Sequence, residues 1–228
     1  MKAIFWMRRD LRWKDNRALT MACKEADEVY PVFIFDKNIL SKLPKDDHRV
    51  SFIHARLEEL QKKHHIHTYY GDPVELIPKL VEQMGAEAVY TNEDYESYAK
   101  IRDTKIGKKV PLNKYLDHII FAGDEIETTT GGPYKVYTPY KRSWLEKLEN
   151  NPKRISEFKY KPAKLAKTKI DLKEVKKLED FDFKQTENIP LLDTDGEKLF
   201  KKYLDKVHDY KETRDYPAMD NTSHLSVH

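Results

Sequence analysis

Small hydroxyl and amide side chains gather near the C-terminal end, where residues 221–223 read Asn-Thr-Ser after the polar turn of residues 213–219. Such side chains accept hydrogen bonds from the first free backbone N–H groups of a helix, so the pattern predicts that a helix begins here. Hydroxyl groups and free N–H groups at a helix N-terminus bind anions well. An isolated helix shorter than about 12–15 residues is marginally stable in water. We therefore expect this helix to have a role in addition to its own folding.

Four histidines, His54, His64, His65 and His67, form the most conspicuous set of potential metal ligands. Imidazole is a common zinc ligand, but no cysteine lies nearby. The histidines come where a polar helix pattern ends, and a helix dipole favours positive charge at that end. We therefore interpret them as a helix-end feature and predict no metal site.

The elements that must position these residues are short apolar runs that alternate with helical patterns over the first 123 residues. Residues 50, 53, 57 and 60 form one apolar helical stripe, and "GDPVELIPKLVEQMG" predicts a helix capped by Asp72 and ended by Gly85. Strand and helix in alternation predict an α/β fold, a doubly wound parallel five-stranded sheet with flanking helices. The five predicted strands are Ala3–Met7, Val29–Phe35, Ile66–Tyr70, Ala86–Thr91 and His118–Phe121.

Parallel sheets carry their sites at the carboxyl ends of the strands. The candidate site residues are therefore the polar ones that follow the runs: Arg8 to Asp10, Asp36, Gly71 and Asp72, and Asn92 to Asp94. The charged residues after the first strand have an alternative role, which is to form a buried ion-pair network that holds loops together. These residues are Arg8, Arg9, Asp10 and Arg12.

Composition and glycine spacing exclude several classes of protein. None of the seven glycines forms a G-x-G-x-x-G or a Walker A loop, which argues against conventional NAD or ATP binding. The 42 Lys and Arg against 39 Asp and Glu give a net charge of only +3, so charge alone does not predict a nucleic-acid or membrane partner. The single Cys23 indicates a reducing compartment, and without a secretory segment or membrane span we predict a cytoplasmic protein.

The chain divides into three predicted parts: an α/β domain over residues 1–130, a linker over 131–190 and the start of a helical domain over 191–228. Ten basic residues against three acids between positions 151 and 177 are typical of a solvated linker, and direct DNA contact is the alternative. Residues 194–197 fit a capping box that begins a helix, and this helix carries an apolar stripe that no later residue of this chain covers. The stripe consists of Leu199, Phe200, Tyr203, Leu204 and Val207.

Four stretches in order resemble the photolyase/cryptochrome family: residues 5–22, 91–103, 131–144 and 210–226. The resemblance covers the whole chain, which corresponds to about the first half of the family's length. It implies the N-terminal part of a DNA photolyase, a lyase that uses light and FAD to repair pyrimidine dimers in damaged DNA. The alternatives are a cryptochrome-like photosensor fragment and an inactive remnant that binds a chromophore or a partner. We expect the chain alone to be inactive, and a second polypeptide to be one possible source of the remaining helical domain.

The resemblance also implies the role of the C-terminal segment. The positions that match the family's FAD pocket are Tyr210, Thr222, Ser223, Leu225 and Ser226, near the diphosphate. Arg214 matches an arginine that contacts the DNA backbone. Asn221 stands where the family usually has glycine, and asparagine also tolerates positive φ.

For the antenna chromophore of the family's α/β domain, the matching positions are Ile34, Asp36, Arg49 and Asp94. These match the deazaflavin-binding branch. The folate branch uses an Asn-Glu pair whose positions here are Tyr98 and Ala99. Without that carboxylate, the resemblance favours a deazaflavin-like or flavin-like antenna over folate.

Overall fold

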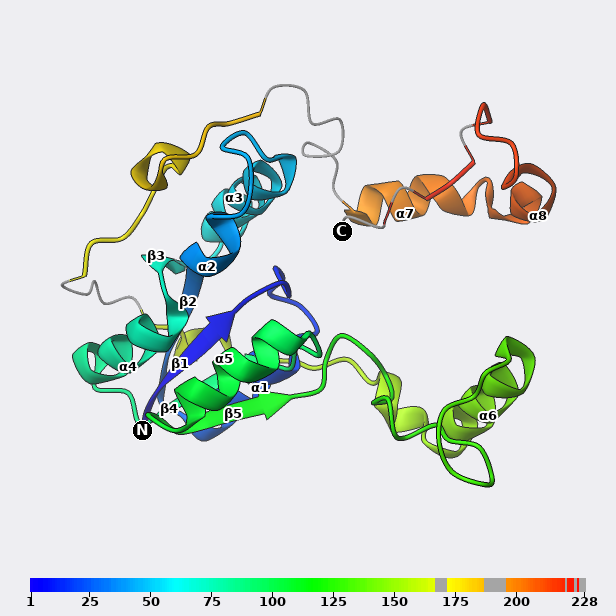
Figure 1. Cartoon of the computed structure of the whole chain (residues 1–228), viewed down its shortest axis with the longest axis horizontal. Coiled ribbons are helices and arrows are strands. Elements are labelled where there is room, and N and C mark those ends of the chain that lie inside the picture. The colour runs from blue at the N-terminus through cyan, green and yellow to red at the C-terminus, as the bar shows by residue number, and fades with distance from the viewer. Residues whose placement is uncertain (167–171, 187–195, 220, 224, 226–228) are drawn as a thin grey trace.

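The computed structural model describes residues 1–166, 172–186, 196–219, 221–223 and 225. Its centre is one parallel sheet with the strand order β3-β2-β1-β4-β5 (Figure 1). The strands are β1 (Lys2–Met7), β2 (Glu28–Asp36), β3 (His67–Gly71), β4 (Ala88–Asn92) and β5 (Leu112–Tyr115). This order reverses direction between β1 and β4, so the predicted doubly wound sheet is confirmed.

Helices cover both faces of the sheet. α1 (Arg17–Glu25) and α3 (His48–Gln61) bury their apolar residues on one face, together with Phe5 and Met7 of β1. α4 (Pro73–Met84) and α5 (Ser97–Gly107) cover the other face, together with Ile4 and Trp6. Successive residues of β1 thus enter opposite cores, as the two-residue period of a strand requires.

Side-chain caps fix where these helices begin and end. Asn16 accepts a hydrogen bond from the backbone N–H of Leu19 at the start of α1. Asp72 accepts one from Val74 at 2.9 Å, and Gly85 ends α4 in the left-handed conformation at φ 60°. Both ends of α4 thus confirm the sequence prediction. Asp36 caps the short α2 (Lys37–Leu40) in the same way, so this residue ends β2 and begins a helix.

The fifth strand was predicted at the wrong place. It is Leu112–Tyr115, paired with β4, and not the apolar run His118–Phe121. β5 is an edge strand with half-exposed residues, so it lacks the continuous apolar run of a central strand. Phe121 instead packs edge-to-face against Trp144, with ring centroids 5.6 Å apart.

The region of the predicted linker contains a helix and several residues that pack on the sheet domain. α6 (Tyr137–Asn150) begins after Val136. Beyond it, 3₁₀ turns occupy Pro152–Ile155, Pro162–Lys164 and Leu178–Phe181. Leu165, Phe181 and Phe183 are buried in the same core as α1 and α3. These stretches are therefore held against the sheet domain.

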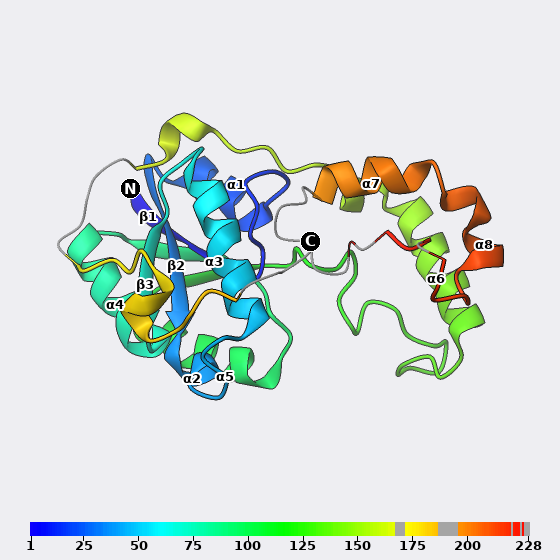
Figure 2. The same ribbon diagram turned by 90° about the horizontal axis from the view of Figure 1, so that it is seen from above.

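The last elements are α7 (Gly196–Leu204), a 3₁₀ turn (Val207–Asp209) and α8 (Tyr210–Thr213). Figures 1 and 2 place them, with α6, to one side of the sheet. Phe200, Leu204 and Val207 of the predicted stripe are nearly half exposed. The helix predicted from residue 221 is not formed over 221–223, in keeping with the cost of nucleating a short helix without packing partners. Among the residues the structure describes, none of the helices has the length and apolar character that crossing a membrane requires.

Candidate functional site

A cleft of about 390 Å³ opens at the carboxyl ends of the strands, where the sheet order predicts a site. It receives side chains from the ends of β1 and β2, from the starts of α3 and α4, and from α5. All four residues assigned to an antenna chromophore line this one cleft: Ile34, Asp36, Arg49 and Asp94. Of the other strand-end candidates, Arg8 and Arg9 also line it.

An indole ring close to two guanidinium groups forms part of the cleft wall. The guanidinium carbons of Arg8 and Arg102 lie 5.0 and 4.8 Å from the ring of Trp6, within cation–π range. Both arginines also bind Asp103, with Arg8 Nη1 at 2.9 Å from each carboxylate oxygen. Burial lowers the pKa of Arg8, and Asp103 opposes that effect. An arginine stays protonated in proteins, so the cleft keeps a fixed positive charge.

The carboxylate of Asp36 is held inside the cleft by two neighbours. The hydroxyl of Tyr98 donates to Oδ2 at 2.7 Å, and Arg102 Nη1 lies 3.6 Å from the same oxygen. Burial, reinforced by the bond to Asp36, raises the pKa of Tyr98 to about 12. The phenol is therefore a neutral donor at physiological pH, and it fixes the orientation of the carboxylate.

Two further arginines stand at the rim. Arg49, whose side chain is 71% exposed, donates to both oxygens of Asp47 at 2.9 and 2.7 Å. This pairing lowers the pKa of Asp47 and keeps Arg49 oriented at the start of α3. Arg9 lies 3.5 Å from Asp94 and 3.3 Å from Glu96. Exposed guanidinium groups at a rim suit an anionic group such as a phosphate.

The alternative role of residues 8–12, loop tying, is confirmed for several of them. Buried Asp10 accepts hydrogen bonds from the backbone N–H of Arg8 and from the side chains of Asn16 and Asn92, at 2.6–2.9 Å. Arg12 Nη2 lies 2.5 Å from Asp117. Arg8 has both roles, because its side chain binds Asp103 and also lines the cleft.

The residues present fit a flat aromatic ligand with a polar edge and an anionic tail. Apolar side chains such as Ile34, Leu40 and Ile53 supply the wall, and the volume falls within the roughly 300–1,000 Å³ of ligand pockets. Asp36 offers an acceptor for a ring N–H, and Arg49 offers a donor for the tail. At the positions of the folate pair, Tyr98 is bound to Asp36 and Ala99 is buried.

The residues assigned to FAD belong to the C-terminal segment, and none of those that the structure describes lines this cleft. Tyr210 is the first residue of α8. Asn221 Nδ2 lies 3.5 Å from the carbonyl oxygen of Asp209, the residue directly before Tyr210. Ser223 Oγ accepts from the backbone N–H of Leu225 at 3.4 Å. Thr222 is exposed, and Ser226 lies outside the described residues. Arg214, assigned to DNA, is half exposed and lies 3.7 Å from Asp215.

Sequence reasoning from strand ends missed the residues of α5. Three residues of α5 fix the orientation of side chains in the cleft: Tyr98, Arg102 and Asp103. They lie one helical turn or more beyond the end of β4. Their signal was present only in the resemblance, since residues 91–103 form one of its four stretches.

Together, these features define a class of α/β protein with a doubly wound parallel sheet, a cleft at the carboxyl ends of its strands and a helical segment after the sheet. The family profile of DNA photolyase matches residues 3–161. The chain belongs to the DNA photolyase family.

Known proteins resemble the chain over nearly its whole length. It is 29% identical over 239 residues to a deoxyribodipyrimidine photo-lyase of Synechococcus, covering 98% of this chain and 49% of that protein. The archaeal photolyase of Sulfolobus tokodaii, solved with two FAD molecules, superposes with a TM-score of 0.72 at 26% identity, over 100% of this chain and 51% of its own. A Synechocystis cryptochrome shares the fold, with a TM-score of 0.78 at 20% identity over 99% and 51%. The chain thus spans about half the length of these relatives.

Proposed function

We propose that this chain forms the N-terminal part of a deoxyribodipyrimidine photolyase, which repairs pyrimidine dimers in DNA with light and FAD. The observation that carries the proposal is the match of 98% of the chain to one half of the Synechococcus photolyase. The strand-end cleft supports it, because the four residues that match the family's antenna positions line it together. Residues 1–130 would be the antenna domain, 131–190 the linker and 191–228 the start of the FAD-binding domain.

We infer that the cleft holds a flavin-like or deazaflavin-like antenna chromophore. The Sulfolobus tokodaii structure, with two FAD molecules and the implication of a novel light-harvesting cofactor, supports a flavin in this family beyond the catalytic one. When bound, an antenna absorbs light and passes the excitation to FAD. The chain's own residues bind and orient it: Asp36 by accepting from a ring N–H, Arg49 by binding the tail, and Ile34 by packing on the ring.

For FAD itself, Tyr210, Thr222, Ser223, Leu225 and Ser226 would hold the diphosphate end. Their hydroxyl and backbone N–H groups are suited to an anion. Bound FAD supplies the electron for repair. Arg214 would contact the backbone of the damaged DNA, since its guanidinium is half exposed. The exposed face of α7 would be covered by the rest of the helical domain, on the same or a second polypeptide.

A chimaera tests the proposal. This chain replaces the matching half of the Synechococcus photolyase, and bound FAD is measured by absorbance. The protein is then reduced and illuminated with DNA that contains cyclobutane dimers, and restored bases are counted. We expect stoichiometric FAD and light-dependent repair. A chimaera that binds FAD but repairs nothing would contradict the proposal and favour the photosensor alternative.

A further inference from the structure

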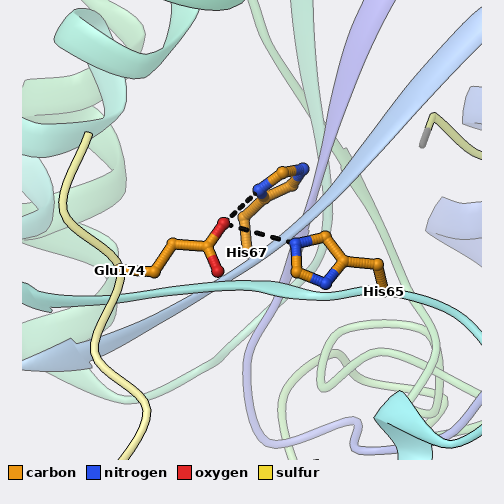
Figure 3. A group of neighbouring side chains, drawn as sticks. All are labelled: His65, His67 and Glu174. Carbon is orange, nitrogen blue, oxygen red and sulfur yellow. Dashed lines mark hydrogen bonds and ion pairs between the residues drawn. The ribbon is translucent and has the colours of Figure 1, made fainter. Parts of the chain in front are cut away.

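Two histidines and a glutamate from distant parts of the chain converge beside the edge strand β3 (Figure 3). Glu174 Oε1 lies 2.6 Å from Nδ1 of His67 and 3.3 Å from Nε2 of His65. The three potential ligand atoms all lie within 4.8 Å of one another. The imidazole rings are nearly perpendicular, with centroids 4.4 Å apart, so their nitrogens point to one place from two directions.

This cluster is not the helix-end feature predicted from the sequence. α3 ends at Gln61, His65 lies in the turn beyond it, and His67 is the first residue of β3. The sequence could not indicate Glu174, because it is more than 100 residues away and belongs to a basic stretch. Only the return of this stretch to the sheet edge brings the carboxylate to the histidines.

Hydrogen bonds between neighbouring residues hold the segment that carries Glu174 against β3. The N–H of Val175 donates to the carbonyl of Thr68 at 2.8 Å, and the hydroxyl of Thr68 donates back to the carbonyl of Val175 at 2.5 Å. Glu174 is thereby fixed next to β3. The His67 side chain is fully buried, and its Nε2 has no hydrogen-bond partner among the described residues, so Nδ1 is the nitrogen that faces the cluster.

We propose that His65, His67 and Glu174 bind a divalent transition-metal ion of the zinc type. Two imidazole nitrogens and one carboxylate oxygen form a donor set that suits Zn²⁺, whereas Mg²⁺ and Ca²⁺ prefer oxygen ligands alone. Three protein ligands leave a fourth position open. His65 and Glu174 line a groove at the surface, which gives an ion and a water molecule access to that position.

The chemistry of the three ligands also explains the hydrogen bonds between the histidines and Glu174. Ring N–H groups of both histidines donate to the same glutamate oxygen. A metal ion replaces those protons, since histidine binds metal in its neutral form. Bound metal would clamp the segment from residue 172 to residue 177 onto the edge of β3, and so fasten part of the linker to the α/β domain.

The test is a titration of the full chain, free of any affinity tag, with Zn²⁺ by calorimetry and with Co²⁺ by visible absorption. We expect one tightly bound ion per chain and the absorption of tetrahedral Co²⁺. His65→Ala and Glu174→Gln each remove one ligand and should lower Zn²⁺ affinity at least tenfold. His65 is 41% exposed, so its replacement leaves the core intact, and circular dichroism checks the fold of both variants.

Matched control variants distinguish binding at this site from non-specific binding of Zn²⁺. His208→Ala and Glu179→Gln replace an exposed histidine and an exposed glutamate elsewhere, and both should bind Zn²⁺ as the parent chain does. Zn²⁺ should also slow tryptic cleavage after Lys173 and Lys176 in the parent chain but not in Glu174→Gln. If the parent binds no stoichiometric ion, or if both ligand variants keep its affinity, the cluster is an ion pair only and the proposal fails.

Discussion

Arg8 and Asp103 are 95 positions apart in the sequence, yet Nη1 of the arginine lies 2.9 Å from both carboxylate oxygens. Their side chains are only 8% and 2% exposed. Arg8 also donates to the backbone carbonyl of Asn92 at the end of β4. The pair therefore joins the loop after β1 to β4 and α5 directly beneath the cleft.

Removing one partner of this pair should destabilise the fold strongly. Asp103→Asn leaves the guanidinium of Arg8 buried without its counter-ion, and breaking a buried pair costs about 3–5 kcal/mol. Chemical denaturation of the parent and the variant measures the difference. Asp124→Asn removes an exposed carboxylate and should change stability by less than about 0.5 kcal/mol. Equal stabilities for Asp103→Asn and the parent would show that the pair does not tie the loops together.

Arg49 offers a test of the antenna site proposed for the strand-end cleft, called the antenna cleft below, and this test leaves the core intact. Its side chain is exposed and paired only with Asp47 among the described contacts, so Arg49→Ala should change stability by less than about 1 kcal/mol. The same change removes a cation at the rim, and we expect at least tenfold weaker binding of a deazaflavin or FMN, measured by fluorescence titration. Arg142→Ala on α6 is the control. Unchanged affinity in Arg49→Ala would place the chromophore elsewhere.

His118 should make stability depend on pH. Burial lowers its pKa from the ordinary 6.5, nearby Arg9 and Arg12 add to this, and the carboxylates of Asp10 and Asp117 oppose it. The unfolded chain therefore binds the proton first as the pH falls below about 6.5, and the contribution of neutral His118 is lost through that range. His118→Asn should show a shallower loss of stability between about pH 6.5 and pH 5 in denaturation at several pH values. His208→Asn should keep the slope of the parent, and an equally steep slope in His118→Asn would contradict the prediction.

Sequence patterns predicted correctly the features that depend on residues close together in the chain. Four of the five strands were predicted to within about two residues at each end. Three of them, β1, β2 and β4, are central strands with continuous apolar runs, and the edge strand β3 is buried over its first three residues. Asp72 and Gly85 were identified because caps depend on residue type alone. The edge strand β5 was missed, since its half-exposed sequence resembles a loop.

The residues of the candidate site show the same difference between local and long-range information. Strand ends are visible in the sequence, so Asp36 and Asp94 could be named from position. Arg102 and Asp103 could not, because their importance arises from partners on β1 and β2 that only the folded sheet brings near. Glu174 is the extreme case. Its contact with His67 depends on the path of a long connection, which no local pattern determines.

The apolar face of α7 should limit the solubility of the chain. Phe200, Leu204 and Val207 are 45–49% exposed, and each large apolar side chain gains about 1.5–3 kcal/mol when it is fully buried. Deleting residues 191–228 should therefore reduce association, measured by light scattering, while thermal unfolding of the remainder stays cooperative. Loss of the cooperative transition in the shortened chain would show that this segment belongs to the core of the α/β domain.

The 228-residue chain by itself should neither hold FAD nor repair DNA. Tyr210, Thr222, Ser223 and Ser226 would reach one end of the cofactor, and each net hydrogen bond contributes only about 0.5–1.5 kcal/mol. Fixing the backbone costs about 1–2 kcal/mol per residue, so the cost of ordering several residues around the cofactor would outweigh a few such bonds. A flavin ring held in this way would also remain in water, without a dry pocket in which to meet a dimer.

The measurement incubates the chain with FAD, removes unbound cofactor by gel filtration, and determines bound flavin by absorbance. The reduced sample is then illuminated with dimer-containing DNA, and the Synechococcus photolyase serves as the positive control. We expect less than a tenth of a flavin per chain and no restored bases. Stoichiometric flavin would contradict the prediction. Because the antenna cleft lies in the other part of the chain, binding of a deazaflavin there should persist in the same sample, so the two cofactor sites can be tested independently.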